Sequence, residues 1–128
     1  MTDQESFPPG GHWYEHVSEY VTVVTLMGSV NVYTAPLLRQ LLLDLINHGR
    51  MFLVLDMTEI SFFDSTGSGV LIGALKRIRA HDGALALVVP SERIQKFFRI
   101  NGLTIVFPIF DTVDRAIEFL GRELGAHG

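Results

Sequence analysis

The sequence predicts a single small α/β domain with a mostly parallel mixed β-sheet, about four helices and an antiparallel strand at its N-terminal end. Strand patterns alternate with helix patterns along the chain, which is typical of parallel strands joined by right-handed helical crossovers. Two strand patterns, residues 51–56 and 84–89, are almost continuously apolar, as strands covered on both faces are. The 128 residues can bury one core without metals or cross-links, and they leave no room for a second domain.

The N-terminal part of the domain is expected to begin with two antiparallel strands. Residues 13–17 form a candidate edge strand, and residues 21–26 are rich in β-branched side chains and end before a glycine. A helix follows, with Thr34 as its N-cap and Pro36 tolerated in its first turn. Its apolar stripe runs until Gly49 and consists of Leu37, Leu38, Leu41, Leu42, Leu45 and Ile46.

Two further helices are expected around the second buried strand. One begins near Ser65 and ends at residues 81–83, His-Asp-Gly. The other is capped by Ser91 and ends before Gly102.

The C-terminal end of the domain combines a short strand with a last helix. Residues 106–110 are predicted as the strand, and Asp111 or Thr112 is expected to cap the helix. The helix is indicated by apolar residues at helical spacing, namely Val113, Ala116, Ile117, Leu120 and Leu124. We therefore expect the folded domain to cover residues 12–125.

Composition and charge exclude several functional classes. The chain has no cysteine, which excludes disulfides, Cys-ligated zinc, iron–sulfur clusters and thiol catalysis. The net charge is −4, although six of the ten Lys and Arg residues lie between Lys76 and Arg99. The overall charge balance is acidic and not basic, so we expect no direct nucleic-acid binding. The basic residues are interpreted as solvated helix faces, with contact to an acidic partner left open.

The chain carries no signal for a membrane. Residues 1–11 are acidic and lack a basic leader and an apolar core, so they are interpreted as a flexible N-terminal arm. The most apolar helix pattern, residues 37–46, is interrupted by charges and is far shorter than the ~20 residues that span a bilayer. We expect a cytoplasmic protein that does not associate with membranes.

The most informative segment joins the first buried strand to the second helix. It ends in residues 64–69, Asp-Ser-Thr-Gly-Ser-Gly, and sets the hydroxyl of Ser65 at a helix start beyond the carboxyl end of a strand. A phosphate at this position is favoured by the free N–H groups and the positive end of the helix dipole. For Asp64 and Ser65 taken singly, simple helix capping is the alternative interpretation.

Glycines cluster in the first turns of the same helix. Gly67, Gly69 and Gly73 each cost the helix up to ~1 kcal/mol relative to alanine. Close approach of the sheet, of a ligand or of a partner backbone would explain them. Close helix–sheet packing alone is sufficient for Gly73.

Other chemistries lack the residues that they require. Residues 67–73 imitate a dinucleotide-binding loop, but the spacing is one residue too long. Asp56 lacks the acidic pair and the lysine that accompany a phosphoaccepting aspartate in receiver domains. A serine hydrolase would need a positioned histidine and a nucleophile elbow. Asp56, Glu59 and Asp64 lack a ligand spacing, so we expect neither a metal nor a cofactor.

Residues 56–69 closely resemble the motif of bacterial anti-anti-sigma factors, small STAS domains whose serine is phosphorylated by the anti-sigma factor that they bind. From about residue 23 to about residue 120 the order of elements is similar to that family, including residues 84–89 and 100–103. The resemblance implies a STAS-like fold and a binding module that is not an enzyme. It also implies phosphorylation at Ser65, with Thr66 as the alternative acceptor.

The resemblance further implies the partners. The unphosphorylated protein would bind an anti-sigma factor serine kinase of the histidine-kinase-like ATPase fold, which supplies ATP and Mg²⁺, and so free a sigma factor. Phosphorylation would weaken the binding, and a PP2C-type phosphatase would restore it. The residues expected at the partner are Ser29, Asn31, Asp64, Ser65, Thr66, Gly67, Ser68 and Gly69.

Two departures from the family are visible. Family members usually carry Gly-Glu-apolar-Asp after the second strand, whereas residues 28–31 here are Gly-Ser-Val-Asn and contain no carboxylate. Ser68 stands where the family generally has a large apolar residue, commonly leucine. The alternative interpretation is a STAS domain that is never phosphorylated and acts as a scaffold or subunit in another signalling or transport-linked assembly.

Overall fold

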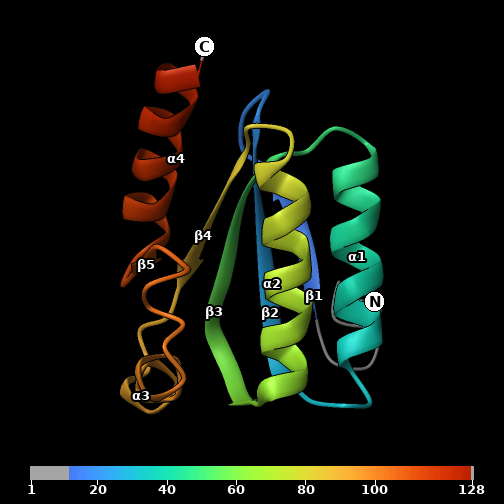
Figure 1. Ribbon diagram of the computed structural model, residues 1–128, viewed down its shortest axis with the longest axis vertical. Helices are drawn as coiled ribbons and strands as arrows, with labels where there is room; N and C mark the ends of the chain where they lie inside the picture. The colour runs from blue at the N-terminus through green and yellow to red at the C-terminus, as the bar shows by residue number, and fades with distance from the viewer. Residues whose placement is uncertain (1–11, 128) are drawn as a thin grey trace, which may run out of the picture.

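The computed structural model describes residues 12–127 of the chain (Figure 1). Within these residues, five strands form one sheet in the order β1-β2-β3-β4-β5, accompanied by four helices. The predicted flexible arm, residues 1–11, lies outside the described residues. The strands are β1 (His12–His16), β2 (Val21–Val30), β3 (Phe52–Phe63), β4 (Ala84–Val88) and β5 (Ile109–Phe110), and the helices are α1 (Ala35–Asn47), α2 (Ser65–Arg79), α3 (Glu92–Ile100) and α4 (Val113–His127).

The sheet is mixed, and its strands lie side by side in the order in which they occur along the chain. β1 pairs with β2 in antiparallel orientation, and every later pairing, from β2 to β5, is parallel. The helices α1 and α2 are the crossovers that join β2 to β3 and β3 to β4. The predicted fold class is therefore confirmed.

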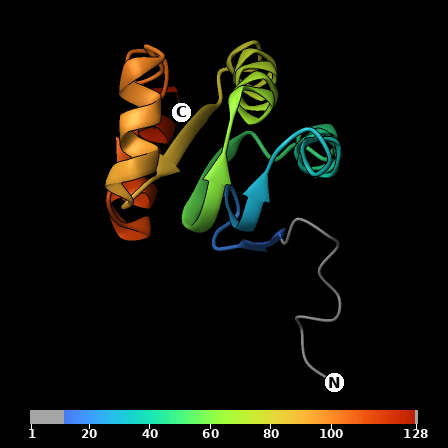
Figure 2. The ribbon, with the colours of Figure 1, turned by 90° about the horizontal axis from the view of Figure 1, so that it is seen from below.

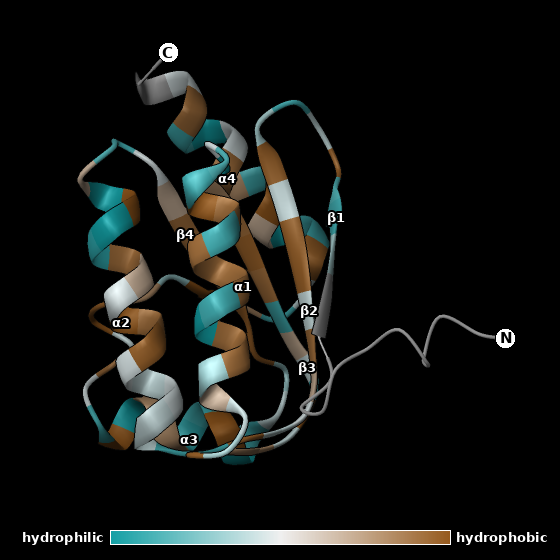
Figure 3. Ribbon diagram, turned by 90° about the vertical axis from the view of Figure 1, so that its right-hand side faces the viewer, coloured by the Kyte–Doolittle hydropathy of each residue, from teal (hydrophilic) through white to brown (hydrophobic). Residues whose placement is uncertain are grey.

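The helices cover both faces of the sheet (Figure 2). α1 and α2 lie side by side on one face, whereas α4 lies on the other. Along β3, Leu53 and Leu55 belong to the core beneath α1 and α2, and Val54 between them belongs to the core beneath α4. This double coverage explains the continuous apolar runs in β3 and β4. Figure 3 shows hydrophobic and hydrophilic residues alternating along α1 and α2, as in helices with one buried side.

Two predicted strands extend further in the structure. β2 and β3 stay paired to their ends, so residues 57–63, which lie in the predicted connection between the first buried strand and the second helix, continue β3. The pairing shifts register twice, and Asp56 accepts hydrogen bonds from the N–H of Thr58 at 3.1 Å and from its hydroxyl at 2.5 Å. Beyond Asp56 the buried residues of β3 are Met57, Ile60 and Phe63, which are three positions apart. A strand is normally recognised in a sequence by burial at every second position, so this part of β3 was not predicted.

The last strand is shorter than predicted. β5 contains only two residues, and residues 101–107 form turns. The apolar pattern at residues 106–110 arises partly from Phe107, whose ring is buried against that of Phe98 with 6.3 Å between the ring centroids. The side chain of Phe107 is part of the hydrophobic core, but its backbone is not part of the sheet.

The last two helices begin with side-chain caps. Ser91 Oγ accepts a hydrogen bond from the N–H of Ile94, as predicted. At the start of α4 the structure selects Thr112 over Asp111, because Thr112 Oγ1 accepts the N–H of Arg115 at 3.2 Å. Asp111 instead lies 3.8 Å from the guanidinium group of Arg115.

Candidate functional site

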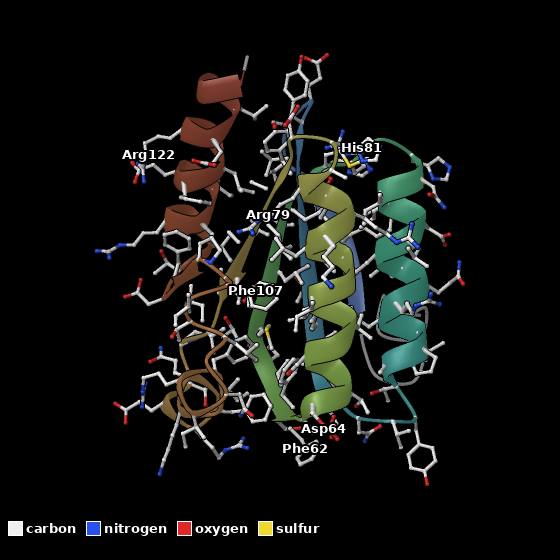
Figure 4. All side chains as sticks on the ribbon, in the orientation of Figure 1. Phe62, Asp64, Arg79, His81, Phe107 and Arg122 are labelled. Atoms are coloured by element: carbon white, nitrogen blue, oxygen red, sulfur yellow. The ribbon has the colours of Figure 1, made fainter. Side chains whose placement is uncertain are left out.

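The predicted phosphoacceptor Ser65 is the first residue of α2 and follows the end of β3 almost directly. Its side chain is exposed, and Figure 4 shows the neighbouring Asp64 and Phe62 at this end of the molecule. Asp64 is the N-cap of α2, because its Oδ1 accepts the N–H of Thr66 at 2.9 Å. Simple capping therefore describes Asp64. Within residues 12–127, no hydrogen bond involves the hydroxyl of Ser65.

The neighbouring hydroxyl of Thr66, in contrast, is hydrogen-bonded. It donates a short hydrogen bond to the same Asp64 carboxylate, which holds it against the cap. The first turn of α2 also presents N–H groups without helical partners and the positive end of the helix dipole. Of the two hydroxyls, only that of Thr66 is bonded to Asp64, whereas Ser65 is exposed at the first position of α2.

The loop between β2 and α1 is held by its own side chains. Asn31 Oδ1 accepts the N–H of Tyr33 at 2.9 Å and the N–H of Thr34 at 3.1 Å. Thr34 Oγ1 accepts the N–H of Asn31 at 3.0 Å and donates to the carbonyl of Ser29 at 2.8 Å. Thr34 occupies the predicted N-cap position of α1, but its hydroxyl bonds to this loop and not to an N–H of the helix. Asn31 therefore fixes the turn that leads into α1.

Gly67 brings α2 against the ends of β2 and β3. A Cβ atom at Gly67 would lie 2.6 Å from Cε1 of Phe63 and 2.8 Å from Cγ1 of Val30, so the helix can start this close only with glycine here. Gly69 and Gly73 differ, because a Cβ atom at either would meet no atom within 4 Å. Helix–sheet packing therefore explains Gly67, and our expectation that it explains Gly73 is wrong.

Two residues predicted at the partner face the protein interior. Gly67 and Ser68 are both buried, and Ser68 is only 8% exposed. Its Oγ has no hydrogen-bond partner among the described residues, although a buried hydroxyl normally has one. The other predicted contacts are at least partly exposed, namely Ser29, Asn31, Asp64, Ser65, Thr66 and Gly69.

Three exposed apolar side chains that the sequence analysis missed lie at the same edge of the sheet. Val32 and Tyr33 follow β2 and are 60% and 85% exposed, and Phe62, near the end of β3, is 45% exposed. The carboxyl ends of the parallel strands β2 and β3 meet at one edge of the sheet, so all three side chains belong to this edge, Val32 and Tyr33 just before α1 and Phe62 just before α2. We call Val32, Tyr33 and Phe62 the apolar edge. Exposed apolar side chains at such an edge are candidates for contact with a partner.

Aromatic packing and a hydrogen bond hold the end of β3, beside Phe62, against α3. The ring of Phe63, directly after Phe62, stacks on Phe98 of α3 with 5.4 Å between centroids and meets Phe97 edge to face at 5.7 Å. Arg93 of α3 also donates a hydrogen bond to the carbonyl of Ser61 at 2.6 Å. The end of β3 is thus fixed by α3 on one side and by α2 on the other.

The part of the chain that the structure describes lacks two other kinds of feature. Each of its helices is too short or too polar to cross a lipid bilayer. No three histidine or carboxylate side chains between residues 12 and 127 gather closely enough to hold a metal ion.

Comparison with known proteins places this fold in a family. The sequence model of the STAS domain matches residues 15–116. The chain belongs to the STAS domain family. This STAS domain is 36% identical over 86 residues to the anti-sigma-B factor antagonist of Bacillus subtilis, covering 67% of the chain and 78% of that relative. The family resemblance predicted from residues 56–69 is confirmed.

Solved structures agree with this assignment. The anti-sigma factor antagonist from Mycobacterium paratuberculosis has the same fold, with a TM-score of 0.72 at 23% identity over 89% of this chain and 97% of that one. The Bacillus cell fate determinant SpoIIAA, solved in its phosphorylated form, gives a TM-score of 0.67 at 25% identity over 84% of this chain and 97% of that one.

Proposed function

We propose that this STAS domain is an anti-sigma factor antagonist whose unphosphorylated form binds an anti-sigma factor and so frees a sigma factor. Phosphorylation of Ser65 ends the binding. The observation that carries the proposal is the exposed, unbonded hydroxyl of Ser65 at the first position of α2, next to the apolar edge. The names of the curated relatives agree with this role.

The proposed interface explains why one phosphate is sufficient. Covering the apolar edge with a partner is favourable by about 25 cal/mol for each Å² of apolar surface removed from water. A phosphate on Ser65 would add roughly 1.5 to 2 negative charges within this contact, and these charges would lose their water on binding. Binding and phosphorylation therefore oppose each other.

The chemical step takes place on the partner. The anti-sigma factor is proposed to be a serine kinase of the histidine-kinase-like ATPase fold that binds ATP and Mg²⁺. The γ-phosphoryl group passes to Ser65 Oγ, the hydroxyl proton passes to a base of the kinase, and ADP leaves. A PP2C-type phosphatase hydrolyses the ester and returns the hydroxyl and inorganic phosphate. The STAS domain itself catalyses neither step, and we place this cycle in the cytoplasm.

The test begins with the identification of the partner. The full chain is used to capture proteins from its native cells, the bound ATPase is identified by mass spectrometry, and it is then produced in pure form. Incubation with Mg²⁺ and ATP should add one phosphate to the STAS domain, and fragment masses should assign it to Ser65. Calorimetric titration should then show weaker binding of the phosphorylated form.

Matched variants separate the switch from a constitutive interaction. Ser65→Ala should bind the kinase and accept no phosphate, and Thr66→Val should still be phosphorylated. Ser65→Glu should bind more weakly than Ser65→Ala. Each tenfold rise in Kd corresponds to a loss of about 1.4 kcal/mol of binding free energy. Equal affinity of the phosphorylated and unmodified forms would refute the switch and favour a STAS scaffold that is never regulated by phosphate.

A further inference from the structure

A groove separates α1 from α2 on the outer surface of the protein. The two helices run side by side in Figures 1 and 3, and the groove between them has a volume of about 390 Å³. Leu42 and Leu43 of α1 and Val70 of α2 supply its apolar lining. Thr66 also lines it, so the groove reaches the residue that follows Ser65.

The groove is open because two residues of α2 have no side chain. Gly69 and Gly73 are exposed, line the groove and lie four residues apart, on the same side of the helix. Glycine is unfavourable inside a helix, and nothing within 4 Å of either position requires it. Gly67, by contrast, is explained by contact with the sheet. The open space therefore lies where a second backbone can approach closely.

Two arginine side chains give the groove its charge. Arg39 of α1 and Arg77 of α2 line it and are exposed. Among the described residues, neither takes part in an ion pair, whereas Arg115 and Arg122 of α4 do. The net charge of the whole chain is −4, so the positive charge of the groove is a local feature. It is complementary to an acidic ligand.

We propose that the groove binds an acidic amphipathic helix of the anti-sigma factor; this inference rests on the proposed function. The apolar face of that helix lies on Leu43 and Val70, its backbone approaches Gly69 and Gly73, and its carboxylates pair with Arg39 and Arg77. From Thr66 to Arg77 the groove follows about three turns of α2, roughly 16 Å, which matches a helix of similar length. Phosphate on Ser65 stands at one end of the groove and repels the acidic helix, which couples the switch to the docking surface.

The first test fills the groove without disturbing the fold. Gly73→Leu adds a side chain where a Cβ atom meets nothing within 4 Å. Gly121→Leu is the matched control, because Gly121 is also exposed, helical and open, but lies in α4 on the other face. We expect Gly73→Leu to weaken binding of the anti-sigma factor captured above by about tenfold or more in calorimetric titration, and Gly121→Leu to leave Kd unchanged. Neither variant should lower the melting temperature.

The second test reverses charge. Arg77→Glu should weaken binding by about tenfold, and the loss should shrink as salt is raised. Arg79→Glu is the control: it makes the same change in the same helix, but Arg79 does not line the groove and lies on the side of α2 away from α1 in Figure 4. It should bind as the wild-type protein does.

The outcomes are distinguishable. If the wild-type protein binds and Gly73→Leu binds equally well, the groove inference is refuted and the proposed function stands. If the wild-type protein binds no anti-sigma factor, both are refuted. If sedimentation shows that the wild-type protein self-associates and Gly73→Leu does not, the groove belongs to a second copy of this chain and the inference is again refuted.

Discussion

Replacing Gly67 by alanine should destabilise the protein, whereas the same replacement at Gly69 should stabilise it. At Gly67 the new methyl group would lie 2.6 Å from a ring carbon of Phe63, and that ring is packed against both Phe97 and Phe98. Overpacking of this kind costs about 1–3 kcal/mol, and the better helix propensity of alanine returns at most about 1 kcal/mol. Since the ring has little room to turn, we expect a net loss of about 1–2 kcal/mol.

At Gly69 the added methyl group meets nothing within 4 Å, so only the helix propensity changes. The expected gain is about 0.5–1 kcal/mol, and the two variants should differ by about 1.5–3 kcal/mol.

Urea unfolding followed by circular dichroism measures this difference. The slope m should be the same for both variants and the wild-type protein, so that the midpoints report stability. With a slope of about 1–3 kcal/mol/M, the midpoints of the two variants should differ by about 0.5 M or more. Midpoints that move in the same direction, or a Gly67→Ala variant as stable as the wild-type protein, would refute the close contact between α2 and Phe63.

Three further predictions concern the core and the site. Ser68→Ala should raise the free energy of unfolding by about 1 kcal/mol in the same urea assay, because it removes a buried hydroxyl without a partner; a loss of stability would mean that a water or a neighbouring group satisfies this hydroxyl. Leu120→Ala should cost about 2–5 kcal/mol, since Leu120 of α4 is fully buried against the sheet, and a melting temperature close to that of the wild-type protein would contradict this packing. Asn31→Asp should keep the loop, because a carboxylate accepts the same two N–H groups, and should raise the rate of Ser65 phosphorylation or tighten binding; an unchanged rate and affinity would mean that Asn31 only shapes the turn.

Sequence patterns predict a strand of this fold correctly where successive residues point to the two covered faces of the sheet in turn. The prediction fails where this alternation stops. The apolar run of β4 marks its strand because its successive residues are all buried. The second half of β3 was missed because its buried residues, Met57, Ile60 and Phe63, are three positions apart in an irregular pairing with β2. Phe107 produced the opposite error, because a buried side chain in a turn resembles one in a strand.

At the candidate site, local chemistry was predictable and surface exposure was not. The residue types of Asp64 and Ser65 before a helix pattern predict a cap and an exposed hydroxyl at a helix start. The exposure of Tyr33 and Phe62 depends on the tertiary arrangement of two strand ends, since an apolar residue in sequence gives no sign of whether anything covers it. The opposite roles of Gly67 and Gly73 likewise depend on what lies opposite each of them.

The strand order of the sheet, which follows the order of the chain, has a consequence for how the protein is made. Each new strand pairs with the strand synthesised just before it, so no pairing has to wait for a strand made later in the chain. The sheet can therefore grow from its N-terminal side as the chain leaves the ribosome. The exception is α4, which is made last and alone covers Val54, Ala86 and their neighbours. Until it docks, one whole face of the growing sheet stays apolar and open to water, and we expect chains that end before α4 to aggregate instead of remaining as smaller folded domains.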